Sequence, residues 1–273
     1  MISVDKINRH YFGRTRRICA ILQMVPFLRC LILNGSLAQG KARPDSDIDI
    51  LVIGRDGRIF TARFFILLLS TLLGVKRSSD DAKSHAGKFC FNYFMTTSYL
   101  KIPAGRGTAM DRYCAENYSK SVLVWGDKKT FRRFFEENER LFALAQKSKD
   151  KDQNHGLKIG MNEICANILR TNLKRVRSSR LIGFTSNNTS RYKPHQDFPI
   201  YTTMVRLIGI FGEMMLGGRF GDWVERILKK IQIRRIERDP RTARHPNLIV
   251  YNDQELLFHP PGRSPGRSID SQR

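Results

Sequence analysis

The chain has 273 residues, which is enough to bury a full hydrophobic core in one large domain or two smaller ones. Apolar residues make up 41% and charged residues 27%, and these proportions exclude a wholly disordered chain. The unusual property is charge, because 48 Lys and Arg against 25 Asp and Glu give a formal net charge of +23. Such an excess favours phosphate-bearing partners, with nucleic acid the first to consider, although a basic composition can also serve solubility alone.

The sequence predicts neither a secreted protein nor a membrane-spanning one. Its five cysteines are odd in number and lack the paired spacing of a zinc site or a disulfide framework, which is typical of free thiols in a reducing cytoplasm. Basic residues between Lys6 and Arg17 interrupt any apolar stretch there, so no signal peptide is predicted. The most apolar segment, residues 64–75, has about half the length that a bilayer requires. We therefore expect a cytoplasmic protein without a membrane span.

Helices and strands alternate along the first 145 residues. Apolar positions at helical spacing predict a helix over residues 4–24, which Pro26 ends. A nearly continuous apolar run over 59–73 predicts a helix that is covered on most sides and stopped by Gly74. Two further helices are predicted over 108–120 and 128–144, and strands at 30–33, 48–53, 89–95 and 122–125. This alternation indicates an α/β domain.

The composition changes after residue 145. Residues 147–156 are polar and highly charged, and they predict an interdomain linker. Beyond the linker, helices are predicted over 157–181 and 200–236, the latter with a break at Gly217-Gly218, and a short extended piece at 248–258. We therefore divide the chain into an α/β domain (1–145), a mainly helical domain (146–259) and a disordered basic tail (260–273).

The segment that carries chemistry is residues 34–54, NGSLAQGKARPDSDIDILVIG. Gly35 permits a tight turn after the first strand and a close approach of backbone N–H groups to a phosphate, and Ser36 adds a hydroxyl donor. Asp47 and Asp49 lie two residues apart at the start of the next strand, so both carboxylates face the same side. Two carboxylates on one face can hold a hard divalent cation, which in turn binds the phosphates.

This pattern resembles the nucleotidyltransferase superfamily, in which a strand ends in Gly-Ser and Asp-x-Asp follows about ten residues later in the next strand. Ala38, Gly40 and the run Ser46 to Asp49 resemble its small bacterial and archaeal branch. The resemblance covers residues 1 to about 140 and implies a mixed sheet flanked by helices. It also implies that Gly35 and Ser36 hold a nucleoside triphosphate, and that Asp47 and Asp49 bind Mg²⁺ or Mn²⁺ and serve catalysis.

The competing interpretation is an ordinary polar turn that leads into an edge strand with solvated acids. Two acids on one face of an otherwise apolar strand repel each other unless a cation neutralises them, and this favours the metal site.

One position departs from the family pattern. The resemblance implies a third carboxylate on the following strand, as a metal ligand and as the base for the attacking hydroxyl, but the strand KFCFNYFM has Asn92 there. An amide oxygen can ligate a metal, so Asn92 is a further candidate ligand, but it cannot accept a proton near neutral pH. Three outcomes remain open: a slow or single-metal enzyme, a binding-only protein, or rescue by Asp45, Asp80 or Asp81.

The expected function is therefore Mg²⁺-dependent transfer of a nucleoside monophosphate from an NTP to a hydroxyl or phosphate acceptor. RNA or a protein is the favoured acceptor, because a cationic small acceptor would prefer an acidic cleft. By resemblance, a related fold in toxin–antitoxin systems nucleotidylates a partner toxin. The alternative from another class is a nucleotide- or RNA-binding regulator that has kept the fold and lost turnover, and Asn92 is the observation behind it.

Overall fold

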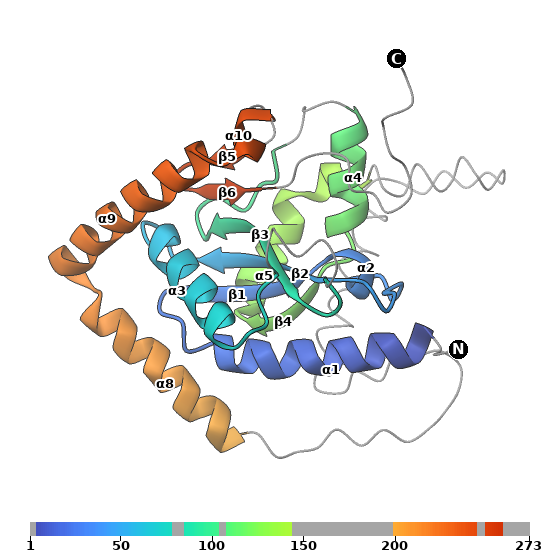
Figure 1. The fold of residues 1–273 in the computed structure, drawn as a ribbon, viewed down its shortest axis with the longest axis horizontal. Helices are drawn as coiled ribbons and strands as arrows, with labels where there is room; N and C mark the ends of the chain where they lie inside the picture. The colour runs from blue at the N-terminus through green and yellow to red at the C-terminus, as the bar shows by residue number, and fades with distance from the viewer. Residues whose placement is uncertain (1–3, 78–84, 104–107, 144–198, 245–248, 259–273) are drawn as a thin grey trace.

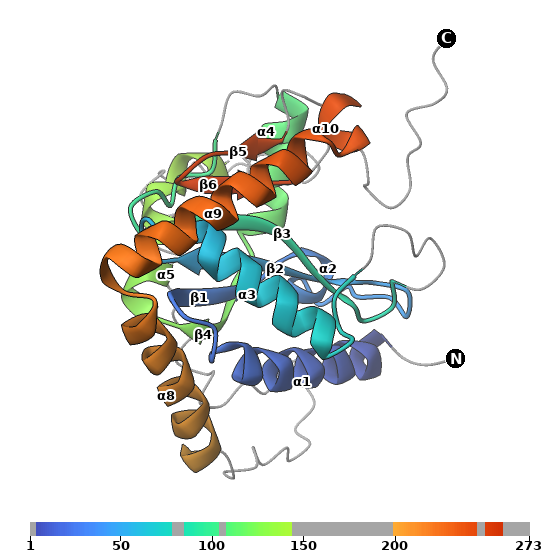
Figure 2. The ribbon, with the colours of Figure 1, turned by 60° about the vertical axis from the view of Figure 1, so that its left-hand side comes forward.

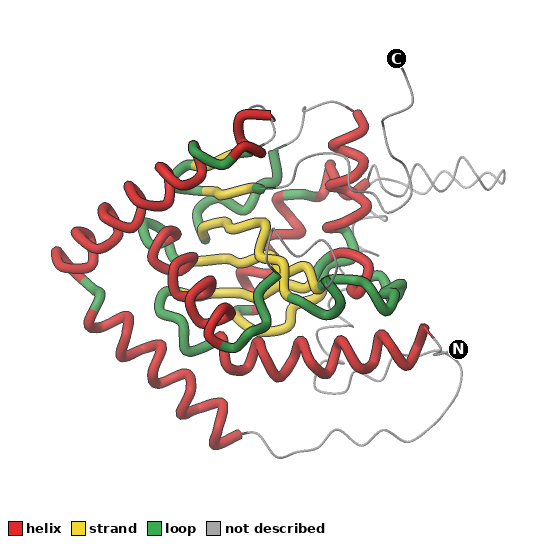
Figure 3. The backbone as a smooth tube through the Cα atoms, in the orientation of Figure 1, coloured by secondary structure: helices red, strands yellow, loops and turns green. Residues whose placement is uncertain are grey.

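The computed structural model describes residues 4–77, 85–103, 108–143, 199–244 and 249–258. The described helices are α1 (Val4–Leu22), α2 (Gly35–Ala38), α3 (Ile59–Leu72), α4 (Thr108–Tyr118), α5 (Lys128–Glu137), α8 (Pro199–Met215), α9 (Gly218–Glu237) and α10 (Pro240–Arg244). The strands are β1 (Leu28–Leu33), β2 (Ile48–Gly54), β3 (Phe89–Thr96), β4 (Val122–Gly126), β5 (Val250–Tyr251) and β6 (Glu255–Leu257). Figure 3 shows these helices around a central sheet.

The sheet is mixed, with six strands in the order β4-β1-β2-β3-β6-β5. Strand β1 pairs antiparallel with both β2 and β4, and β3 runs parallel to β2, with Ile48 opposite Phe89 and Asp49 opposite Cys90. This arrangement confirms the predicted mixed sheet flanked by helices, and each of the four predicted strands is present. The parallel pair β2 and β3 brings the starts of these two strands to the same edge.

Two hydrophobic cores cover the two faces of the sheet. Alternate residues of β1 show the division, because Leu31 belongs to the core formed with α1 and α3, whereas Ile32 belongs to the core formed with α4 and α5. In Figure 1, α3 lies in front of the sheet and α1 runs along its lower side, and the two views show α9 running along the outer side of α3. The central strands are therefore buried on both faces, which explains their almost entirely apolar sequences.

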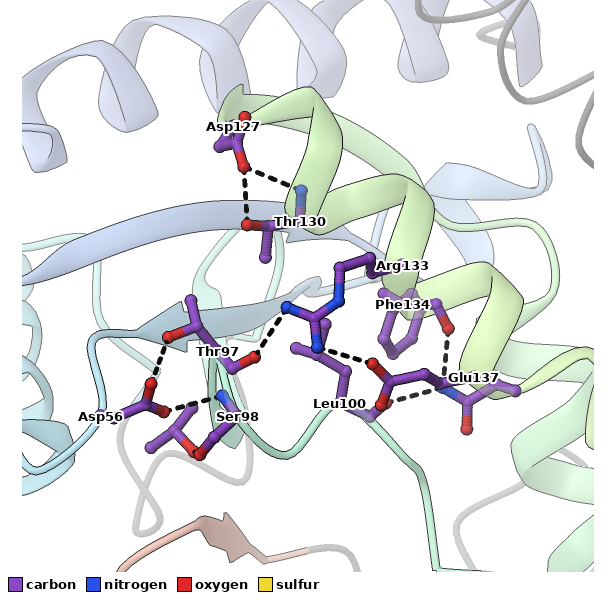
Figure 4. Close-up of polar contacts among 11 residues, drawn as sticks. Asp56, Thr97, Ser98, Leu100, Asp127, Thr130, Arg133, Phe134 and Glu137 are labelled. Atoms are coloured by element: carbon purple, nitrogen blue, oxygen red, sulfur yellow. Dashed lines mark hydrogen bonds and ion pairs between the residues drawn. The ribbon is translucent and has the colours of Figure 1, made fainter.

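Side-chain hydrogen bonds hold the loops at the ends of β2 and β3 (Figure 4). The carboxylate of Asp56, after β2, accepts from Thr97 Oγ1 (2.8 Å) and from the Ser98 amide (2.7 Å), after β3. Arg133 of α5 donates to the carbonyl oxygen of Thr97 over 3.3 Å. Helix α5 itself begins at Asp127, which accepts from the Thr130 amide over 2.8 Å as an N-cap. This edge of the sheet is thereby tied to α5.

Residues from the C-terminal part of the chain complete the sheet and cover α3. Strand β6 pairs antiparallel with β3, so residues predicted to be a short extended piece extend the N-terminal sheet. The buried Glu225 of α9 accepts from the amides of Phe60 (2.9 Å) and Thr61 (2.8 Å) in the first turn of α3. The division of the chain near residue 145 stays a prediction, and the predicted linker, the helix over 157–181 and the tail lie outside the described residues.

The predicted helix over 200–236 is two helices, and the predicted break at Gly217-Gly218 separates α8 from α9. The apolar helix α3 is open to solvent on one side, which is compatible with the expectation that most of its sides are covered. Phe64, Leu68 and Leu72 are 38%, 42% and 74% exposed. Their spacing of four residues places them on one stripe, which faces away from the sheet. None of the described helices is long and apolar enough to cross a membrane.

Candidate active site

The two acids predicted to bind metal lie at the start of β2. Asp47 immediately precedes the strand and Asp49 is its second residue, so both side chains project on the same side. The backbone of β2 is fixed at this point, because the carbonyl oxygen of Asp49 accepts from the Asn34 amide over 2.9 Å. Asn34 is buried, and its side-chain oxygen accepts from the Ser121 hydroxyl. The end of β1 is thus held against the start of β2.

Gly35 is in direct contact with the Asp49 carboxylate. Its φ is +69°, and a Cβ atom at this position would lie 2.3 Å from Asp49 Oδ2. Only glycine tolerates both conditions, because other residues rarely adopt this φ and a side chain here would overlap the carboxylate. The requirement for Gly in the motif therefore comes from the Asp49 side chain as well as from the turn.

Helix α1 holds the segment between Ser36 and Asp47. The Asn8 side chain donates to the carbonyl oxygen of Gly40 (2.8 Å) and accepts from the amide of Ala42 (3.1 Å). The Tyr11 hydroxyl donates to the carbonyl oxygen of Pro44 over 2.6 Å. After α2 ends at Ala38, this polar, partly exposed segment contains no further helix or strand before β2. The two halves of the motif therefore keep their relative positions through α1.

Strand β3 supplies two further side chains beside Asp49. Cys90 is the direct partner of Asp49 in the parallel pair, and ligand atoms of Asp47, Asp49 and Cys90 lie within 4.8 Å of one another. The Asn92 side chain donates from Nδ2 to Asp49 Oδ1 over 3.3 Å. The amide nitrogen, rather than the oxygen, is thus directed at the carboxylate. In this arrangement Asn92 positions Asp49, while its role as a metal ligand stays a prediction.

Arg77 makes an ion pair with Asp47 through Nη1 and Oδ2. It lies after α3, where its amide donates to the carbonyl oxygen of Phe89 over 2.9 Å, next to the bridge between Lys76 and Phe89. The side chains of Arg77 and Asp47 are 25% and 21% exposed, so solvent and solutes reach this pair. A guanidinium group beside two carboxylates neutralises part of their charge, and it also offers donors for a phosphate group.

The electrostatics of the site centre on Asp49. Burial, and then the neighbouring charge of Asp47, raise the pKa of Asp49 to about 7, although Arg77 and the hydrogen bond from Asn92 act in the opposite direction. Burial also raises the pKa of the Cys90 thiol, so this side chain is neutral near pH 7. A carboxyl with a raised pKa is one whose negative charge the protein alone does not fully compensate.

The residues present fit a divalent cation. Two carboxylates converge from one strand, Asp49 retains uncompensated charge, and the lack of a side chain at Gly35 lets the Asp49 carboxylate lie against the turn. The thiol of Cys90 adds a softer donor than the carboxylate that the family pattern implies. Asp47 and Asp49 would hold the cation, with the Gly35 turn against Asp49 and Arg77 paired with Asp47. The role of the partly exposed Ser36 stays a prediction.

Sequence reasoning missed two residues of this cluster. Cys90 stands two positions before Asn92 on the same strand. Because side chains alternate between the two faces of a strand, this spacing already indicated that Cys90 and Asn92 share a face. Arg77 carried no such signal, because only the fold brings the end of α3 next to Asp47. Of the acids considered for rescue, Asp45 is exposed in the turn, and Asp80 and Asp81 lie outside the described residues.

Residues 20–85 match the family model described as a nucleotidyltransferase domain. No curated protein matches the chain. A solved structure described as "Crystal structure of the toxin-antitoxin with AMP-PNP" is similar at 18% sequence identity and a TM-score of 0.27, over 52% of this chain and 93% of that chain. The match over residues 20–85 confirms the predicted resemblance of the N-terminal part of the chain to nucleotidyltransferase domains.

Proposed function

We propose that this protein is a Mg²⁺-dependent nucleotidyltransferase that moves a nucleoside monophosphate from an NTP to a hydroxyl or phosphate acceptor, with RNA or a protein as the favoured acceptor. The observation that carries the proposal is the contact between the Gly35 turn and Asp49, with the Asp47 carboxylate beside it. A cation bound there would contact both carboxylates, and the phosphates bound to it would lie near the Gly35 turn. The family match over the same residues supports nucleotidyl transfer in general.

In this proposal the protein contributes positioning and charge. A bound divalent cation would supply charge neutralisation for the triphosphate and the leaving pyrophosphate. Asp47 and Asp49 hold that cation, and the Gly35–Ser36 turn and Arg77 bind phosphate oxygens. Asn92 keeps the Asp49 carboxylate in place, but it accepts no proton near neutral pH. Transfer would therefore depend on alignment of the acceptor oxygen with the α-phosphate.

A transfer assay with labelled NTPs tests the proposal. The protein is incubated with each NTP, with Mg²⁺ or Mn²⁺, and with RNA, protein and small-molecule acceptors. We expect label to move to an acceptor in a cation-dependent manner, and we expect Asp47→Ala and Asp49→Ala to abolish the transfer. Asp45→Ala is the matched control, because Asp45 is an exposed acid two residues before Asp47. Transfer that survives in both active-site variants would refute the assignment.

A second candidate is a nucleotide- or RNA-binding regulator without turnover. Two observations favour it: Asn92 replaces the expected third carboxylate, and Arg77 already neutralises part of the carboxylate pair. This candidate predicts calorimetric binding of NTP without transfer under any of the conditions above. Activity that appears in Asn92→Asp would identify the missing base as the cause, and robust transfer by the unmodified chain would exclude the regulator.

A further inference from the structure

Helices α8 and α9 carry large apolar side chains on their solvent side. We call this surface the α8–α9 face, and it consists of Met204, Leu207, Ile208, Phe211, Met214, Met215, Phe220, Trp223, Ile227 and Ile231. Their exposed fractions run from 37% at Ile227 to 71% at Met214, and the other eight are each more than half exposed. Two of the aromatic rings, Phe220 and Trp223, stack on each other with centroids 5.9 Å apart.

The face is separate from the surfaces by which these helices pack on the protein. Helix α8 packs through Val205, Gly209 and Glu213, and the Glu213 carboxylate makes an ion pair with Arg29 at 2.8 Å. A Cβ at Gly209 would lie 2.9 Å from the carbonyl oxygen of Gln23, so α8 lies directly against the backbone. The helix is thus fixed in this orientation, and its exposed apolar residues are not the result of loose packing.

The stripes on the two helices form one surface. On α8, Met204 and Ile208 each come one position before a packing residue. On α9, Phe220 and Ile231 likewise come one position before the buried Gly221 and Gln232. One position along a helix corresponds to a turn of about 100° around its axis. The exposed apolar residues of α8 and α9 therefore lie on the same side of the buried residues in both helices. The helices follow each other around the outside of the fold after a short turn (Figures 1 and 2), so the stripes continue into each other.

Basic residues border this face. Arg219, Arg226, Lys230, Arg234 and Arg235 of α9 are exposed. Two of the three acids of α9 do not balance them, because Asp222 pairs with Arg58 and Glu225 is buried against α3. The third acid, Glu237, is the last residue of the helix. An apolar patch of this size with a charged rim is typical of an interaction site. The rim selects a partner with negative charge.

Charge argues against two occupants from the chain itself. A second copy would also carry a net charge of +23, so the two copies repel each other. Residues 144–198 contain eleven Lys and Arg against four Asp and Glu, so this segment also lacks the complementary charge. The protruding side chains further favour a deformable partner, because nine of the ten are more than half exposed and thus project from the helices.

We propose that the α8–α9 face docks the protein on the surface of an anionic lipid bilayer. The Trp, Phe, Met, Leu and Ile side chains enter the boundary between headgroups and acyl chains, and the Lys and Arg side chains of α9 contact the lipid phosphates. The protein lies on the membrane without crossing it, in keeping with the described helices. The proposal is independent of nucleotidyl transfer and places the protein's own chemistry at a membrane surface.

Vesicle flotation of the full chain tests this inference. We expect binding to phosphatidylcholine vesicles that contain phosphatidylglycerol, about tenfold or more weaker binding to pure phosphatidylcholine, and loss of binding at high salt. Phe211→Glu with Ile227→Glu should weaken binding to anionic vesicles about tenfold or more. Arg226→Glu with Lys230→Glu should also weaken binding to anionic vesicles, because these changes remove positive charge from the rim. Arg132→Glu, at an exposed site on α5, is the control and should have little effect on binding. Thermal unfolding checks that each variant remains folded.

Tryptophan fluorescence gives an independent readout. The chain has two tryptophans, so Trp125→Phe leaves Trp223 as the sole emitter. We expect its emission to shift to shorter wavelength with anionic vesicles and to be quenched by brominated acyl chains. The inference is overturned if folded protein does not bind anionic vesicles, if the face variants bind as the unmodified chain does, or if Trp223 stays in water. Saturable binding of an acidic protein without vesicle binding would assign the face to a protein partner instead.

Discussion

Gly35 and Asp49 act as one unit at the scale of single residues. The turn that ends β1 brings the Gly35 Cα so near Asp49 Oδ2 that any side chain would overlap it. Gly-Ser and Asp-x-Asp are thus separated in the sequence but brought into contact by the fold, through Gly35 and Asp49. Asn8 and Tyr11 of α1 stabilise the intervening loop through their hydrogen bonds to its backbone. The motif therefore depends on residues that lie outside it.

Gly35→Ala should damage the site more than the fold. The substitution costs about 1–2 kcal/mol of stability through the left-handed φ, and its methyl group displaces the Asp49 carboxylate. We expect cation-dependent NTP affinity, measured by calorimetry, to fall about tenfold or more. Gly57→Ala is the matched control, because Gly57 also has a φ of +69° but a Cβ there would have no neighbouring atom within 4 Å. Equal affinity in the two variants would contradict the role of this contact.

Cation binding should depend on pH through Asp49. Burial and the charge of Asp47 raise the pKa of Asp49 to about 7, and a cation binds the carboxylate, so protons compete with the cation below that pH. We expect Mn²⁺ affinity, measured by calorimetry, to rise as the pH increases toward 7 and to level off above it. Asp49→Asn should remove most of the affinity and its pH dependence. A flat profile for the unmodified chain would show that Asp49 is not the titrating ligand.

Asp49 should also make the stability of the fold depend on pH. Stability should fall as the pH rises, whereas cation affinity should increase. A carboxyl whose pKa is higher in the folded state than in the unfolded state stabilises the fold while it is protonated. This contribution is complete below the ordinary pKa of an aspartate and is lost as the pH rises through about 7. In the absence of divalent cations, the melting temperature of Asp49→Asn should therefore decline less over this range than that of the unmodified chain.

At the scale of elements, α3 depends on a residue from α9. Its first turn has no side-chain cap of its own, since the N-cap residue is Arg58. Glu225 of α9 caps the start of α3 instead. It accepts hydrogen bonds from the amides of Phe60 and Thr61 and from the Thr61 hydroxyl. The start of α3 directly follows the strand that carries Asp49. Packing of α9 thus holds the start of α3, and Arg77, which follows the other end of α3, reaches Asp47.

Glu225→Ala should destabilise the protein by about 2–4 kcal/mol, because it leaves buried amide groups of α3 without acceptors. Urea unfolding measures this change. Glu237→Ala, at an exposed position near the end of α9, should change stability by less than about 0.5 kcal/mol. If both variants unfold at the same urea concentration, Glu225 does not stabilise α3 as the contacts indicate.

The sequence predicted local features of the fold well and long-range ones poorly. Apolar periodicity located the strands and the break between α8 and α9, and the spacing of Gly35, Asp47 and Asp49 predicted one side of the site. The positions of Arg77 and Glu225 could not be predicted, because each acts on residues far away in the chain. The pairing of β6 with β3 could not be predicted either, because the two strands are far apart in the sequence. The exposed stripe of α3 was missed because a continuous apolar run does not show which side is covered.

At the scale of the whole molecule, the charge of +23 should control association with RNA. If RNA is a partner, basic side chains displace cations from its phosphates, so affinity falls with salt. We expect the dissociation constant for single-stranded RNA, measured by fluorescence anisotropy, to rise about a hundredfold or more between about 50 and 200 mM salt. An affinity that is independent of salt, or absent at low salt, would remove RNA from the favoured acceptors.

The central claim is that Asp47 and Asp49, beside the Gly35 turn, gather a divalent cation and the triphosphate bound to it. Calorimetric titration of a non-hydrolysable NTP analogue, with and without Mg²⁺ or Mn²⁺, tests this claim most directly in the unmodified chain and in Asp47→Asn with Asp49→Asn. We predict binding that requires the cation and is lost in the double variant, while thermal unfolding shows that the variant remains folded. Binding that is equally strong without the cation, or unchanged in the folded double variant, would contradict the account.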